Sequence, residues 1–188
     1  MTIHRTRRLG DSILRERCQR IANPRSPAVR VVADDLRDTL RDWRERGASG
    51  CGIAAPQIGA PIRMILVMDN NRRRTLLNPE IVDVGDEDFL VWDECSSFPD
   101  LTVRVQRAYR ITVKYEDFTG KGHTLEADGS LAELLQHGID HLDGVLAVDR
   151  ACGLDPFCLR EEWNRRWGAE GRYGTPTPRE LPHAVQVL

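Results

Sequence analysis

The segment His137-Gly138-Ile139-Asp140-His141 places two histidines four residues apart. On a helix, positions i and i+4 lie on one face, one turn apart, so the two imidazoles can reach a single metal ion. The leucines around the segment suit a helix that is buried on most sides; they are Leu131, Leu134, Leu135 and Leu142. The spacing alone is equally consistent with two core or surface histidines, so further ligands have to be sought elsewhere in the chain.

The residue after the first histidine departs from the familiar zinc-protease signature. In that signature a glutamate follows the first histidine and acts as general base. Gly138 occupies the position here. Because the glutamate is not a metal ligand, its loss lowers the expectation of standard hydrolysis but not that of metal binding. Cys95, in a turn-forming stretch with Ser96 and Ser97, is the best candidate for a third ligand, although the residues alone favour an ordinary buried thiol.

Hydrophobic periodicity indicates an α+β fold, because several antiparallel strands precede a helix. Ser26-Pro27 is typical of a helix start, and Gly144 of a helix end. The predicted helices cover residues 26–46, 130–143 and 155–167. The predicted strands cover residues 63–68, 75–79, 81–84, 100–107, 109–116 and 123–127, with a proline break after the second. We expect one domain over residues 1–168 and an irregular tail over 169–188.

Composition limits the class of protein. The chain has 188 residues, 40% of them hydrophobic, with 27 basic and 29 acidic side chains and a net charge of -2. This length allows a sizeable core, and the balanced charge argues against a dedicated nucleic-acid binder. The sequence has no run of about 18 apolar residues, so no membrane-spanning helix is predicted. The five cysteines and the lack of a secretory signal favour a cytoplasmic protein with reduced thiols.

Three motifs make the chain resemble the peptide deformylases. That family carries a Gly-x-Gly-x-Ala-Ala-x-Gln loop, a Glu-Gly-Cys-Leu-Ser loop and a His-Glu-x-x-His helix, in this order. Residues 50–57 match the first motif fully, residues 93–97 keep the cysteine and the last serine of the second, and residues 137–141 keep both histidines of the third. The resemblance covers roughly residues 8–150. It implies antiparallel sheets around a central metal-binding helix.

The resemblance also implies a ligand set. Cys95, His137 and His141 would bind one divalent metal ion, Fe²⁺ or Zn²⁺, with Ni²⁺ also compatible. Three protein ligands with one open position are typical of a catalytic metal site. Such a metal lowers the pKa of the water bound to it, so that hydroxide is available near neutral pH. Asp93 and Arg107 occupy the places of a supporting ion pair.

The substrate contacts follow from the same resemblance. The side-chain amide of Gln57 and the backbone N–H of Ser96 would donate hydrogen bonds to the developing oxyanion. Gly50 and Gly52 would let the backbone approach the substrate closely, and Cys51 would lie beside it. In the family this loop pairs with the substrate like an added strand.

Two acidic residues occupy positions at which the family usually has a non-acidic residue. Glu94 replaces the glycine before the metal-binding cysteine, and Glu133 shares one helix face with His137 and His141. Glu94 or Glu133 could replace the proton transfer lost at Gly138. Glu94 is the first candidate, because it adjoins a proposed ligand, although a solvated surface glutamate fits as well. Glu133 would make the pocket for the first substrate side chain polar, which predicts a substrate other than formyl-methionine.

The sequence therefore predicts a metal-dependent hydrolase that removes a formyl group from an N-formylated peptide or an amino-acid-derived substrate. The alternative is a weak or inactive paralogue that acts as a binding module, which Gly138 favours. The expected partners include neither nucleic acid nor membrane. The sequence does not indicate an oligomeric state.

Overall fold

The computed structural model describes residues 2–46, 51–69, 72–167 and 171–179. Three α-helices are present in these ranges: α1 (Pro27–Glu45), α2 (Gly129–Leu142) and α3 (Arg160–Arg166). The strands are β1 (Gly52–Ala54), β2 (Met64–Asp69), β3 (Arg72–Val84), β4 (Glu87–Glu94), β5 (Leu101–Ala108), β6 (Arg110–Glu116), β7 (Gly122–Asp128), β8 (Phe157–Leu159) and β9 (Thr177–Pro178). Short 3₁₀ turns cover Ser12–Arg15, Ala55–Ile58 and Ala147–Arg150.

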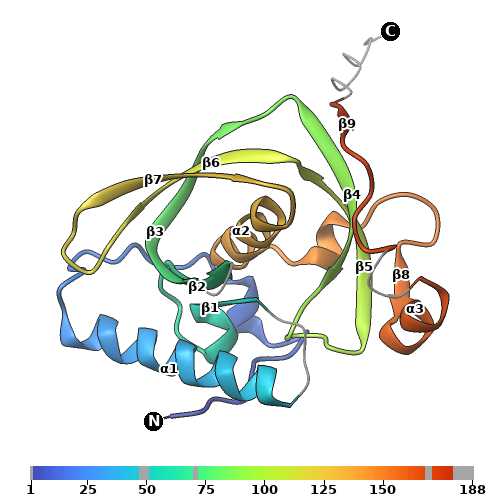
Figure 1. The fold of residues 1–188 in the computed structure, drawn as a ribbon. Helices are drawn as coiled ribbons and strands as arrows, with labels where there is room; N and C mark the ends of the chain where they lie inside the picture. Colours follow the sequence, from blue (N-terminus) through green and yellow to red (C-terminus); the bar gives the residue numbers. More distant parts are fainter. Residues whose placement is uncertain (1, 47–50, 70–71, 168–170, 180–188) are drawn as a thin grey trace, which may run out of the picture.

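Two antiparallel sheets enclose a central helix. The five-stranded sheet has the order β1-β2-β3-β6-β7, and the four-stranded sheet has the order β8-β5-β4-β9. Figure 1 shows α2 in the centre, the larger sheet curving around it, and α1 along the other side of β1 and β2. The predicted α+β class, with antiparallel sheets around a central helix, is confirmed.

Packing around α2 explains why this helix is central. Ala132, Leu135 and Leu142 are fully buried in one core with residues of the larger sheet. Gly138 faces β2, and a Cβ atom there would lie 3.1 Å from Ile65 Cγ2. The missing side chain therefore lets the helix and the strand approach closely. At the helix end, Gly144 adopts a φ of +74° against the Arg15 carbonyl, a position that only glycine fits easily.

Most predicted elements are present. The helix expected over 26–46 is α1, the one over 130–143 is α2, and the hairpin expected from 109 to 127 is β6–β7. In the described part of the chain, no helix combines the length and apolar character needed to cross a membrane. These successes come from segments with strong periodicity and clear end signals.

Four local predictions differ from the structure. The break expected at Pro79 is a register shift between β3 and β6, so β3 continues through it. β4 was not anticipated. The helix predicted over 155–167 was wrong in its first part, because residues 157–159 pair with β5 as β8. The tail predicted as irregular contains β9, which pairs with the start of β4. In each case contacts with a distant strand decided the local structure.

We predict that Leu135→Ala lowers the free energy of unfolding by about 2–5 kcal/mol, because it leaves a cavity at the centre of the core. The matched control is Leu154→Ala, since Leu154 is 89% exposed and should change stability by about 0.5 kcal/mol or less. Urea unfolding followed by tryptophan fluorescence gives both values. Equal effects of the two substitutions would contradict the central position of α2.

Candidate metal centre and substrate pocket

Cys95, His137 and His141 converge beside a pocket that the first two of them line. One ligand atom from each lies within 4.8 Å of the other two. Cys95 Sγ is 3.2 Å from His141 Nε2, and the two histidine rings have centroids 4.9 Å apart. The helix brings the histidines together locally, whereas the cysteine arrives from the loop after β4. The structure thus brings together the three residues predicted as ligands.

A buried ion-pair chain holds the first histidine. His137 Nδ1 lies 2.8 Å from a carboxylate oxygen of Asp93, which is itself fully buried. His137 Nδ1 hydrogen-bonds Asp93 Oδ2 at 3.0 Å, and Arg107 donates to the same oxygen at 2.9 Å and also binds Asp140 on α2. Such a contact fixes the orientation of the ring and leaves Nε2 for a metal. The chain therefore couples β4, β5 and α2 at the site.

Charges around the thiol favour its ionised form. Burial alone would raise the pKa of Cys95, but His141 and His137 outweigh it and lower the pKa to about 5. Burial would also lower the pKa of His137, whereas Asp93 and Cys95 raise it well above the usual value. A thiolate with two imidazoles is a donor set that suits a divalent transition metal.

Gln57 lies directly beside this cluster. Its side-chain oxygen accepts a hydrogen bond from Ala54 N at 2.8 Å, which fixes the direction of the amide. The amide nitrogen then points to Ser96 Oγ at 3.0 Å and to Cys95 Sγ at 3.5 Å. Gln57 is thus a buried donor aimed at the ligand cluster.

The pocket has a volume of about 260 Å³. Predicted residues that line it, besides Gln57, Cys95 and His137, are Cys51, Gly52, Glu94, Ser96 and Glu133. Gly50 lies outside the described residues. His141 is among the ligand cluster but does not line the pocket surface. Nearly all the residues predicted for the site therefore meet at one place.

Both unusual carboxylates are paired with arginines. Glu94 Oε2 lies 3.0 Å from Arg160 and 3.6 Å from Arg172. Glu133 Oε2 lies 3.8 Å from Arg172 Nη2. Burial, followed by the charge of Asp93, raises the pKa of Glu133 to about 7. The sequence predictions missed both arginines, because their segment was assigned to a helix and a tail with no signal for pocket contacts.

The comparisons with known proteins agree with this arrangement. The family model described as polypeptide deformylase matches residues 3–156. The chain belongs to this family. A peptide deformylase of Heliobacterium modesticaldum is 39% identical over 156 residues, which cover 83% of this chain and 99% of the relative. A peptide deformylase of Bartonella quintana is 40% identical over 164 residues, 84% of this chain and 89% of the relative.

Solved deformylase structures share the fold. The crystal structure from Thermotoga maritima matches with a TM-score of 0.75 at 31% identity, over 81% of this chain and all of that one. The structure from Synechococcus elongatus in complex with actinonin matches with a TM-score of 0.74 at 30% identity, over 86% and 84% of the two chains. Family members are metal-dependent hydrolases that act on N-formylated peptides, and this chain has a cluster of three residues that could hold a metal ion.

The residues present fit a tetrahedral metal ion. With metal–sulfur and metal–nitrogen bonds of about 2.3 and 2.0 Å, neighbouring ligand atoms of a tetrahedron are about 3.5 Å apart. The separation of 3.2 Å between Cys95 Sγ and His141 Nε2 is close to this value. Cys95 and His141 thus need only small movements to share one ion, and the His137 donor lies within 4.8 Å of both.

We predict that Asp93→Asn weakens metal affinity by about 10–100-fold, because it removes the anion that orients His137. Asp88→Asn is the matched control, since Asp88 is another buried carboxylate on β4 but pairs with Arg179 instead. Competition with a chelator of known affinity measures both variants. An unchanged affinity in Asp93→Asn would show that the carboxylate does not support the metal site.

Proposed function

We propose that this protein hydrolyses the formyl amide of an N-formylated peptide or amino-acid-derived substrate at a divalent metal site formed by Cys95, His137 and His141. Fe²⁺ or Zn²⁺ is the proposed ion, and Ni²⁺ suits the same thiolate and imidazole donors. The observation that carries the proposal is the meeting of this cluster with the Gln57 amide beside one pocket. A bound metal would supply Lewis acidity toward water and the formyl carbonyl.

The β1 edge supports the proposed binding mode. β1 is an end strand of the five-stranded sheet, and Cys51, Gly52 and Ile53 line the pocket. An extended peptide can pair with such an edge through backbone hydrogen bonds. A Cβ at Gly52 would lie 2.9 Å from Leu134 Cδ1, so glycine also keeps this strand close to α2. We assign residues 50–52 to binding of the substrate backbone.

The oxyanion would be stabilised by two donors. Gln57 directs its amide toward Cys95, and the backbone N–H of Ser96 is the second donor we assign to this role. Losing one such donor typically costs a factor of about 10²–10³ in kcat. These groups act on charge that develops only in the transition state, so they contribute to rate rather than to substrate affinity.

Proton transfer requires another group, because Gly138 has no side chain. Glu94 is the residue we assign to it, since it lines the pocket next to Cys95. Its carboxylate is bound by Arg160 and Arg172, so it must exchange these contacts to accept a proton. This requirement makes the assignment sharply testable.

We predict that Glu94→Gln lowers kcat for formate release by about 10²–10⁴-fold while metal content stays the same. Glu87→Gln is the control, because Glu87 lies at the exposed opposite end of β4. Formate is measured with a coupled dehydrogenase assay and metal by elemental analysis. Full activity of Glu94→Gln would eliminate Glu94 as the proton carrier without affecting the ligand assignment.

The alternative function, a binding module, is favoured by one observation, Gly138 itself. A cavity of about 20 Å³ lies beside Gly138, bounded also by Gln57, Ile65 and His137. It holds about one water molecule, and Ile65 crowds the position where a side chain would begin. The packing around the glycine is therefore tight, and Ile65 must move to admit a glutamate side chain.

We predict that Gly138→Glu gains little activity alone but about 10²–10⁴-fold when combined with Ile65→Ala, which makes room for the carboxylate. Ile65→Ala alone is the control for loosened packing. The measurement is formate release from formyl-Met and other formylated dipeptides by metal-loaded protein. If the double variant is folded, metal-loaded and inactive, while the wild type binds peptide without releasing formate, the binding-module function replaces the hydrolase.

A further inference from the structure

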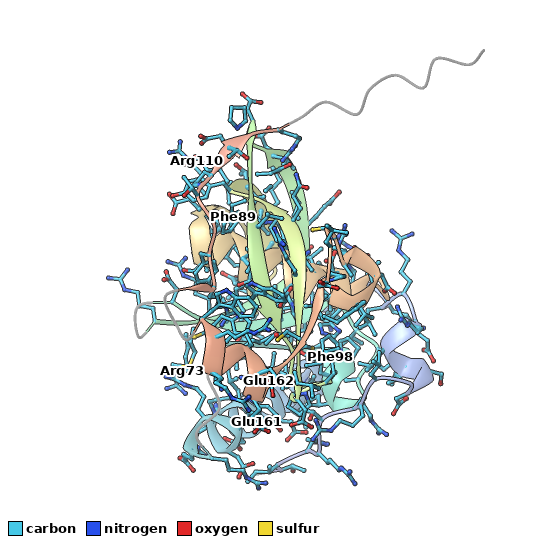
Figure 2. The ribbon with its side chains drawn as sticks, turned by 90° about the vertical axis from the view of Figure 1, so that its right-hand side faces the viewer. Arg73, Phe89, Phe98, Arg110, Glu161 and Glu162 are labelled. Atoms are coloured by element: carbon cyan, nitrogen blue, oxygen red, sulfur yellow. The ribbon has the colours of Figure 1, made fainter. Side chains whose placement is uncertain are left out.

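One wall of the pocket is built by residues beyond the part of the chain that matches the family. The family match ends at residue 156, and Arg160, Arg172 and Tyr173 all line the pocket. Figure 2 shows this face, with the C-terminal segment beside β4 and with Glu161 and Glu162 on α3 below it. These three pocket residues therefore lie beyond the family-matched region.

The backbone around Arg172 is firmly attached to β4. Trp92 N donates to Arg172 O at 3.0 Å, and Gly174 N donates to Leu90 O at 2.8 Å. Between them, the Tyr173 ring stacks on Phe89 with centroids 6.1 Å apart. These contacts continue the pairing that β9 makes with the start of β4. They hold the guanidinium group of Arg172 at the pocket.

Four side chains of alternating charge follow one another along this wall. Arg160 lies 3.0 Å from Glu94, Glu94 lies 3.6 Å from Arg172, and Arg172 lies 3.8 Å from Glu133. The last two separations exceed a hydrogen bond. Among the described residues, Arg172 Nε has no hydrogen-bond partner. That atom is buried, but the terminal nitrogen Nη2 lies beyond hydrogen-bond distance of Glu133, so Arg172 can still donate there and Glu133 can still accept.

We propose that this wall selects a substrate whose first side chain is a neutral carboxamide, as in an N-formyl-glutaminyl peptide, with its carbonyl accepting from Arg172 and its amide donating to Glu133. The inference rests on the proposed function, whose pocket it describes in more detail. Leu131 and Leu134 also line the pocket and suit the methylene groups of such a side chain.

Charge explains why a neutral group fits better than an ion. With all four side chains ionised, the formal charges of Arg160, Glu94, Arg172 and Glu133 sum to zero, so any ion would be attracted by one member and repelled by its neighbour. It would lose hydration without a net gain. A thioether would leave both Arg172 and Glu133 unsatisfied. A carboxamide supplies one acceptor and one donor, which matches the two open partners.

The test compares formyl-Gln-Ala with formyl-Met-Ala, formyl-Lys-Ala and formyl-Glu-Ala on the metal-loaded full chain. We expect kcat/KM for formate release to be at least about tenfold higher for the glutamine peptide than for each of the others. Glu133→Leu should reverse the preference in favour of methionine. Glu133→Gln is the matched control, because it keeps hydrogen-bonding capacity and should keep the glutamine preference. An equal or higher value for any other peptide on the wild type would overturn the inference.

A second measurement separates this inference from the proposed function. Calorimetry gives the affinities of the unformylated peptides Gln-Ala and Met-Ala for the same protein. If no peptide releases formate but Gln-Ala binds at least about tenfold more tightly, the hydrolase function fails and the pocket assignment stands. If formyl-Met-Ala is turned over best, the function stands and the pocket assignment fails. If Glu133→Leu does not fold, Arg172→Met provides the same reversal test, and an unchanged preference there would overturn the inference.

Discussion

The buried carboxylate of Asp93 is the constraint on which the site depends. It is fully buried and binds His137 on one side and Arg107 on the other. Arg107 continues to Asp140 on α2, and Asp140 also binds Arg150 through two contacts of 2.6 Å. Buried charges are costly unless each is paired, so removing one member would leave another uncompensated. The pairing therefore fixes the position of α2 relative to β4 and β5, and with it the geometry of the ligand cluster.

The same scaffold carries the ligand cluster and the pocket beside it. The cluster needs only the helix, the loop after β4 and the Gln57 turn, which all lie within the family-matched region. The pocket also depends on Arg172, which the C-terminal segment brings to Glu94 and Glu133. The proposed metal ligands and the proposed substrate-selecting arginine thus lie in different parts of the chain. Gly138 lies in the family-matched region, on α2 between the two histidines. Ile65 packs closely against it, in the space that a side chain would fill.

Secondary structure was predicted correctly where the signal lies within one segment, and less well where contacts between distant segments decide it. The α1 and α2 helices were foreseen because an apolar stripe and end signals lie within one segment. Pro79 misled the prediction of β3, since a register shift accommodates it opposite β6. Residues 157–159 have an apolar pattern that fits a helix or a strand, and pairing with β5 decided for the strand. A single sequence contains no direct signal for such pairing.

The sequence by itself placed His137 and His141 on one helix face, because residues four apart are one helical turn apart, and the family resemblance added Cys95 as the third proposed ligand. Only the tertiary structure decided that Cys95 lies against a histidine 46 positions away. It also decided that Arg172 lies between Glu94 and Glu133, since the C-terminal segment pairs with an edge of β4. Helix periodicity involves residues that are only a few positions apart. Strand pairing and charge pairing join segments that are distant along the chain, and no local sequence pattern indicates which distant segments will meet.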